Sequence, residues 1–170
     1  LISAIFGVAG DRVIVALFLT MLTCIVLGMG VPTTANYIIM ATTCAPILVN
    51  GMGINKIAAN MFVFYFGIVA DITPPVALAA YAGSAIAKSN PMKTALNASR
   101  LAIAAFIVPY IFAFNPAMLF IDTGVLGVVT IIVTSLIGLF GVAAGLEGYM
   151  FANLNVIERL LSIVGGLCLI

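Results

Sequence analysis

The stretch 28-GMGVPTTANY-37 lies in the middle of a run of 43 uncharged residues, Val13–Asn55. Two glycines, a proline and two threonines interrupt a segment that is otherwise mostly apolar. Glycine and proline favour turns and helix ends over helix interiors. A helix that simply crosses a membrane does not need such an interruption, so this stretch predicts a more specialised structure.

The composition indicates a polytopic membrane protein. Of 170 residues, 65% are hydrophobic and only 6% are charged, whereas a soluble domain carries about 25% charged residues. Two uncharged runs, Leu101–Ile121 and Thr123–Leu146, have 21 and 24 residues, enough to cross an apolar layer of about 30 Å. The alternation of polar and apolar residues typical of transmembrane barrels is missing. The sequence therefore predicts an all-α fold.

Several classes of function are excluded by the residue types of the chain. Histidine is absent, which excludes histidine-based general-base catalysis and histidine-rich metal sites. The net charge of +1 leaves no basic surface for nucleic acid. No nucleophile elbow, phosphate-binding loop or paired carboxylates occur, so we expect no enzyme activity and no cofactor. The cysteines are widely separated and are expected to be small apolar core residues. They are Cys24, Cys44 and Cys168.

The lengths of the segments around the first interruption predict a re-entrant helical hairpin. Val13–Leu27 and Asn36–Val49 have 15 and 14 residues. At 1.5 Å per residue, each is roughly 22 Å long, too short to span the apolar layer. Residues 13–49 together are too long for one crossing without extreme tilt. We therefore expect a hairpin that enters and leaves the membrane on one side, rather than one long kinked crossing.

A second interruption, 71-DITPP-75, predicts a broken transmembrane helix over residues 57–87. It separates Ile57–Ala70 from Val76–Ala87, segments of 14 and 12 residues. Neither segment spans the membrane alone, but together they have about the right length. The two prolines remove two backbone donors and bias the residue before them away from the helical conformation. The break should therefore lie near the centre of the bilayer.

A charged segment after the broken helix predicts a short interfacial helix over residues 91–100. Asn90 is a suitable N-cap, and Pro91 suits the first helical position. The polar stripe of this helix consists of Lys93, Asn97 and Arg100, at spacings of four and three residues. Such a stripe lies on one helix face, which we expect to contact water.

The rest of the chain predicts further membrane helices, with a span over residues 101–114 and additional C-terminal helices in 122–170. Three glycines in the cleanest span are expected to pack closely against another helix. They are Gly138, Gly141 and Gly145. Residues 1–12 are expected to end a preceding segment. Because the last uncharged run is too short to span, we expect this chain to be a piece of a longer protein.

The distribution of positive charge predicts the orientation of the hairpin. Lys88, Lys93 and Arg100 lie within 13 residues of one another, whereas Arg12 and Lys56 flank the hairpin. Short loops rich in lysine and arginine favour the cytoplasm. The hairpin should therefore enter the membrane from the outside.

Two interruptions at similar depth predict one polar site. Irregular backbone is tolerated at membrane depth only inside protein or beside a water-filled cavity. Freed carbonyls and threonine hydroxyls are hard oxygen donors suited to a small cation, and helix C-terminal ends add partial negative charge. The predicted cation ligands are Gly28, Gly30, Thr33, Asp71 and Thr73. The predicted substrate-binding residues are Thr33, Thr34, Asn36, Thr73 and Pro74.

Asp71 is the decisive residue of this hypothesis, because it is the only acidic or basic residue between Lys56 and Lys88. Acidic groups within membrane spans mark ion or proton paths. Alternatively, Asp71 caps the second half of the broken helix or pairs with a lysine. The threonines can bond back to the preceding helical turn. Asn36 and Asn60 can form helix–helix hydrogen bonds as readily as they bind a substrate.

The order of these elements resembles the large membrane subunit of tripartite ATP-independent periplasmic (TRAP) transporters. The motifs that carry the resemblance are 28-GMGVPTTA-35 and 73-TPPV-76, within a match over roughly Val13–Leu119. The tail, residues 120–170, resembles the extra C-terminal helices of the branch in which the small and large membrane subunits are fused. One departure is notable, since the dicarboxylate-type branch usually has an acidic residue where Pro32 stands and an apolar residue where Asp71 stands.

The resemblance implies a sodium-driven, elevator-type secondary transporter in the bacterial inner membrane, with Na⁺ as coupling ion. It would import a small organic solute, expected to be an organic acid, from a periplasmic binding protein. Residues 13–121 would form the second of two inverted repeats. The upstream part of the permease, including its fused small subunit, would be a partner. The shifted acid implies either that the negative charge has moved across the site or that one sodium site is altered.

A second function remains open on the residues alone. A channel or proton-conducting membrane subunit could also use Asp71 in a central pathway. Such a pore would show continuous current in bilayers, whereas a transporter would show saturable, sodium-coupled uptake.

Overall fold

The structure is a computed structural model that describes residues 7, 10 and 12–170. The prediction for residues 1–12 therefore lies largely outside the described part. The described residues form helices and contain no β-strand beyond one isolated bridge between Tyr149 and Asn153, which confirms the all-α prediction. The chain divides into two compact units, Leu1–Phe114 and Asn115–Ile170.

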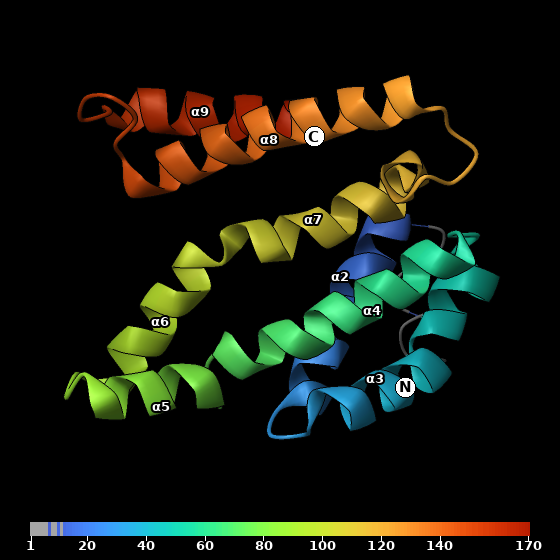
Figure 1. Cartoon of the computed structure of the whole chain (residues 1–170), viewed down its shortest axis with the longest axis horizontal. Coiled ribbons are helices and arrows are strands. Elements are labelled where there is room, and N and C mark those ends of the chain that lie inside the picture. The colour runs from blue at the N-terminus through green and yellow to red at the C-terminus, as the bar shows by residue number, and fades with distance from the viewer. Residues whose placement is uncertain (1–6, 8–9, 11) are drawn as a thin grey trace. The chain divides into compact units, whose positions relative to one another are not determined.

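In the first unit, two helices joined by a short loop pack against a third helix (Figure 1). Helix α2 (Val13–Gly28) and helix α3 (Thr33–Thr43) flank the first interruption, and both contact α4 (Lys56–Val69). The interruption of the helix within 28–35 is thus confirmed. The membrane path of residues 13–49 and their orientation stay predictions.

The predicted bounds of the second arm of the hairpin are wrong. The sequence predicts a helix over Asn36–Val49, but α3 begins three residues earlier and ends at Thr43. A π-helical turn, η1 (Ile47–Gly51), follows. Pro46 explains the difference, because a proline lacks the N–H group that an α-helix would use at this position.

The predicted broken helix is present. Helix α4 ends at Val69, a 3₁₀ turn η2 (Ala70–Ile72) follows, and α5 (Leu78–Ile86) begins after an irregular segment. Within that segment, Pro74 and Pro75 cannot donate backbone hydrogen bonds. Ala77, immediately before α5, has a left-handed backbone with φ of 36°. The chain therefore changes direction between two short helices.

The chain then returns along the broken helix. Helix α6 (Pro91–Leu101) packs against α5, and α7 (Ile103–Phe114) packs against α4 (Figure 1). The predicted N-cap is confirmed, since the Asn90 side chain accepts a hydrogen bond from the Lys93 N–H at 3.1 Å. The three residues of the polar stripe are all exposed.

Aromatic rings fix α7 against α4. Phe62 and Phe66 of α4 are fully buried. Their ring centroids lie 5.3 Å and 6.0 Å from the ring of Tyr110 on α7, at interplanar angles of 80° and 75°. Such edge-to-face pairs stabilise a protein by about 0.5–1.5 kcal/mol beyond the burial of their area. The first unit therefore has a packed core on the side of α4 that faces α7.

The second unit is a pair of helices, α8 (Val125–Glu147) and α9 (Val156–Leu169), preceded by a 3₁₀ turn η3 (Pro116–Leu119). The end of α8 is capped by a side chain from α9. The Arg159 guanidinium donates from Nε to the Gly145 carbonyl and from Nη2 to the Leu146 carbonyl, both at 2.9 Å. These bonds satisfy carbonyls that the helix end leaves without a partner.

The predicted glycine ridge of α8 packs closely against α9, as expected. A Cβ atom built on Gly138 would lie 2.6 Å from the carbonyl oxygen of Gly166, and one on Gly145 would lie 2.8 Å from that of Arg159. One on Gly141 would lie 3.2 Å from the Ser162 carbonyl. The absence of side chains therefore lets the two backbones approach one another.

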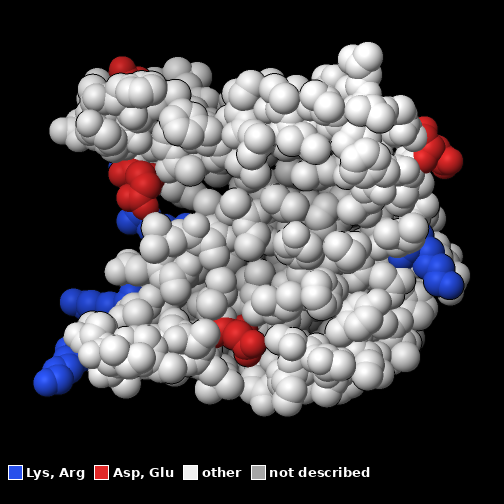
Figure 2. Space-filling model, viewed as in Figure 1, with Lys and Arg blue, Asp and Glu red and all other residues white. Residues whose placement is uncertain are grey.

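Within the part of the chain that the structure describes, two helical segments are long and apolar enough to cross a membrane by length and composition. They are Pro91–Phe114, with 24 residues, and Val125–Glu147, with 23. Most of the face seen in Figure 2 is uncharged, and its few charged residues are scattered. These features agree with the predicted membrane location.

The glycine contact between α8 and α9 generates a stability prediction. In Gly166→Ala, the new methyl group would lie 2.5 Å from the Gly138 carbonyl oxygen and 2.9 Å from Val142. We expect this overpacking to lower the free energy of unfolding by about 1–3 kcal/mol, measured by denaturation in detergent. The matched control is Gly165→Ala, because nothing lies within 4 Å of its Cβ position. Equal destabilisation by both variants would contradict the close-packing interpretation.

Candidate functional site

The two interruptions lie against one another in the structure. The end of α2 contacts the turn η2. A Cβ atom built on Gly28 would lie 3.0 Å from the Ala70 Cβ and 3.3 Å from the Gly67 carbonyl oxygen. Gly28 thus allows the first break to approach the second. Residues separated by about 40 positions in the sequence therefore share one location.

A cavity of about 310 Å³ lies between the two breaks. Asp71 lies on its wall and is partly exposed. The other lining residues come from the α2–α3 loop and from the start of α5. They are Gly30, Val31, Pro32, Leu78 and Ala79. Of the predicted cation ligands, Gly30 and Asp71 therefore line one cavity, and Gly28 is the last residue of α2, two positions before Gly30.

Asp71 does not cap the second half of the broken helix. Helix α5 begins at Leu78, its N-cap residue is Ala77, and no side chain makes a cap hydrogen bond there. Asp71 instead lies in the 3₁₀ turn at the end of α4. The capping alternative for this residue is thus wrong, and its carboxylate is placed where it can contact a ligand in the cavity.

Asn36 is buried at the contact between the two breaks. Its side chain is 1% exposed, and its Nδ2 donates a hydrogen bond to the Gly67 carbonyl at 3.0 Å. Its Oδ1 is buried and has no hydrogen-bond partner in the described part of the chain. Leaving a buried polar atom without a partner costs about 1–3 kcal/mol. This oxygen is therefore available to a ligand.

Side chains hydrogen-bond to the backbone carbonyls around the second break. A shift from α to 3₁₀ bonding leaves carbonyls near the helix end in need of other partners. Four carbonyls near the break each accept a hydrogen bond from a side chain. The Asn36 amide donates to Gly67 at 3.0 Å, and the Thr73 hydroxyl donates to Val69 at 2.7 Å. The Ser99 hydroxyl donates to Ile72 at 3.0 Å, and the Tyr81 hydroxyl donates to Pro75 at 2.6 Å. These bonds explain how irregular backbone is tolerated in an apolar protein.

The predicted site threonines have different surroundings, since Thr73 lies at the second break whereas Thr33 and Thr34 begin α3. Thr73 bonds back to Val69, the structural role that the sequence left open. Because the hydroxyl donates its hydrogen there, its oxygen lone pairs stay available to a cation. Thr33 and Thr34 lie exposed in the first turn of α3, next to Pro32. Pro74, partly exposed, lies in the irregular segment before α5.

Ser99 and Gly67 take part in this arrangement but were not singled out by the sequence. Ser99 had a usable signal, because it lies one helical turn after Ala95, which is fully buried, and away from the polar stripe. A polar residue on the apolar face of a helix needs a partner. Nothing local distinguishes Gly67 from the other glycines, so only the fold reveals its contact with Asn36.

The chain matches a family of membrane transport components. The family described as "Tripartite ATP-independent periplasmic transporter, DctM component" matches residues 1–140 of the 170. This match confirms the resemblance carried by the two motifs. No curated protein and no solved structure matches the chain significantly.

The contact between Asn36 and Gly67 generates a prediction of coupling. A Cβ atom on Gly67 would lie 2.9 Å from the Asn36 Nδ2, so Gly67→Ala should displace the amide and weaken its hydrogen bond. Asn36→Ala removes the amide and makes room for the added methyl group. We therefore expect each single variant to lower the free energy of unfolding. The double variant should lower it by less than the sum of the two single-variant losses, by about 0.5–3 kcal/mol.

The matched control for this cycle is Gly83→Ala in α5, since nothing lies within 4 Å of its Cβ position. It should leave stability unchanged or raise it, because alanine has the higher helix propensity. Strict additivity of Asn36→Ala and Gly67→Ala in denaturation experiments would show that the two residues do not interact as described.

Proposed function

Because the chain belongs to the DctM family of tripartite ATP-independent periplasmic transporters, we propose that it forms the part of a sodium-coupled transport core that holds the ion. The family consists of membrane transport components rather than enzymes. The proposed ion site lies between the α2–α3 loop and the end of α4. The observation that carries the proposal is the cavity at the contact between the two breaks, with Asp71 on its wall. The buried Asn36 Oδ1, which has no partner among the described residues, belongs to the same contact through the bond from Asn36 to Gly67.

The oxygen atoms gathered at this place suit sodium. Asp71 supplies a carboxylate on the cavity wall. Asn36 donates from Nδ2 to the Gly67 carbonyl, one helical turn before Asp71, and would supply its unpaired Oδ1. The C-terminal end of α2 at Gly28 adds partial negative charge. Carboxylate, amide and hydroxyl oxygens are hard donors, which prefer hard cations. The site would thus hold the ion with one full negative charge and several neutral oxygens.

The substrate would lie on the α3 side of the same cavity. Thr33 and Thr34 are exposed in the first turn of α3, whose N–H groups and positive dipole end favour an anion. Thr73 and Pro74 would contact the substrate from the second break. Since neither lysine nor arginine is among the described residues that line this cavity, a strongly basic carboxylate clamp would come from another part of the permease. We propose a small organic acid as the substrate class.

The proposed mechanism is elevator-type transport in the bacterial inner membrane, with delivery by a periplasmic binding protein. The lengths of the two arms support a re-entrant hairpin, because α2 and α3 have 16 and 11 residues and an upright span needs about 20. Both arms pack on α4. The upstream part of the permease, with its fused small subunit, would complete the core. Membership of a transporter family favours this function over a channel or a proton-conducting subunit.

Asp71→Asn in the complete transporter tests the ion site. The amide keeps the shape of the side chain but removes its charge, so the sodium concentration for half-maximal uptake should rise about tenfold or more, as expected for loss of a charge-assisted contact. The assay is uptake into proteoliposomes with the binding protein present. Asp122→Asn is the matched control, because Asp122 is exposed and lies in the second unit. An unchanged sodium dependence of Asp71→Asn would remove Asp71 from the site.

A further inference from the structure

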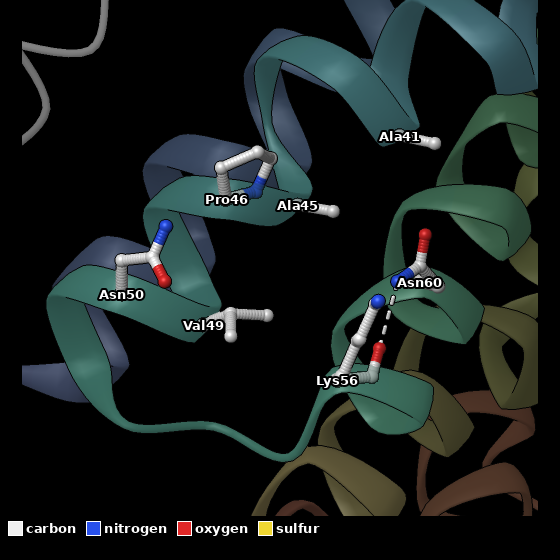
Figure 3. Close-up of a pocket in the computed structure, with 7 residues that line it drawn as sticks. All are labelled: Ala41, Ala45, Pro46, Val49, Asn50, Lys56 and Asn60. Atoms are coloured by element: carbon white, nitrogen blue, oxygen red, sulfur yellow. Dashed lines mark hydrogen bonds between the residues drawn. The ribbon is translucent and has the colours of Figure 1, made fainter.

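A second cavity, of about 340 Å³, lies at the other end of α4 (Figure 3). One wall is apolar and is formed by Ala41, Ala45 and Val49, from the end of α3 and the turn η1. The facing wall is polar and presents Lys56 and Asn60 from the start of α4, whereas Asn50 lies on η1 with Val49 (Figure 3). The cavity therefore has two chemically different halves.

This cavity is separate from the proposed ion site. Lys56 is the first residue of α4, and Asp71 follows the last residue of that helix. Fifteen residues at 1.5 Å per residue place them roughly 22 Å apart along the helix. Half of the apolar layer is only about 15 Å thick. If the break lies near the bilayer centre, Lys56 is at the level of the lipid headgroups.

The polar wall presents hydrogen-bond donors. The Asn60 amide is held in place, because its Nδ2 donates to the Lys56 carbonyl at 2.8 Å and its Oδ1 accepts from the Tyr37 hydroxyl at 3.3 Å. A second amide hydrogen on Nδ2 remains for another acceptor. Figure 3 shows the Lys56 ammonium beside this amide. The N-terminal end of α4 adds partial positive charge at the same place.

The elements around this cavity carry no acidic residue. The sequence has neither aspartate nor glutamate between Asp11 and Asp71, so α3, η1 and α4 supply no carboxylate to balance the ammonium. An ammonium and an amide donor beside an apolar wall suit an anion that has an apolar part. Lysine binds phosphate as a point charge, and basic groups at headgroup level attract anionic lipids.

We propose that this cavity binds the phosphate group of an anionic phospholipid, with Lys56 and Asn60 as donors and the apolar wall against the glycerol and first acyl carbons. A soluble phosphate ester shares the same headgroup chemistry. The alternative is that Lys56 only extends its ammonium into water, as lysine side chains at membrane boundaries commonly do. In that case the cavity would bind no ligand.

The test is lipid binding to the complete, delipidated membrane protein in detergent, titrated with phosphatidylglycerol and followed by native mass spectrometry. Lys56→Gln should weaken binding of one phosphatidylglycerol about tenfold, as expected for loss of a charge-assisted hydrogen bond, whereas Lys56→Arg should retain it. The matched control is Lys93→Gln, because Lys93 is an exposed lysine on α6. Equal affinity of Lys56→Gln and Lys93→Gln would overturn the proposal.

A second variant and a competitor separate the remaining outcomes. Ala41→Leu adds volume to the apolar wall and keeps Lys56, so it should also weaken the lipid; full binding by a correctly folded variant would overturn the proposal. Glycerol 3-phosphate is the competitor. Failure to displace the lipid supports a phospholipid as the occupant, and displacement at comparable concentration supports the phosphate site with a soluble occupant.

Discussion

The first unit depends on the hydrogen bonding of the carbonyls around the break after α4. In an apolar environment, a carbonyl without a partner costs several kcal/mol. Three helices outside the irregular segment supply hydrogen-bond donors to these carbonyls. The donors are Asn36 from α3, Tyr81 from α5 and Ser99 from α6. The irregular segment is therefore a junction of the unit, because the helices that satisfy it must also pack around it.

The same constraint explains why the proposed ion site lies at this junction. A side-chain amide has both a donor end and an acceptor end, and Asn36 uses its donor end to hold the Gly67 carbonyl. Its acceptor end, Oδ1, is then buried and has no partner among the described residues. A cation in that place would satisfy the oxygen without disturbing the bond to Gly67. The Nδ2 end of the Asn36 amide thus stabilises the fold, and its Oδ1 end would bind the ion. Asp71 would supply the negative charge that balances the cation.

Local signals in the sequence predict much of the first unit. The prolines and glycines mark both interruptions, the Asn90–Pro91 pair marks the start of α6, and the glycine ridge predicts close packing of α8. The individual contacts around the interruptions could not be predicted, because they link distant positions such as Asn36 and Gly67 or Ser99 and Ile72. The extent of α3 was mispredicted, since apolar composition alone continued the helix past Pro46, where the structure has a π-helical turn.

The two units are stabilised by different interactions, and this bears on where function can reside. Within a membrane the hydrophobic effect does not drive apolar helices together, so van der Waals packing and hydrogen bonds determine how they associate. In the first unit, aromatic rings and buried polar groups join helices that include irregular segments. In the second unit, the backbones of α8 and α9 approach closely at glycines. The second unit also has a cavity, of about 230 Å³, but the polar group that lines it is the Arg159 guanidinium that caps α8. The cavity at the interrupted helices of the first unit is instead lined by the Asp71 carboxylate. The family match covers all of the first unit and ends within α8, so the proposed ion site lies wholly inside the matched region.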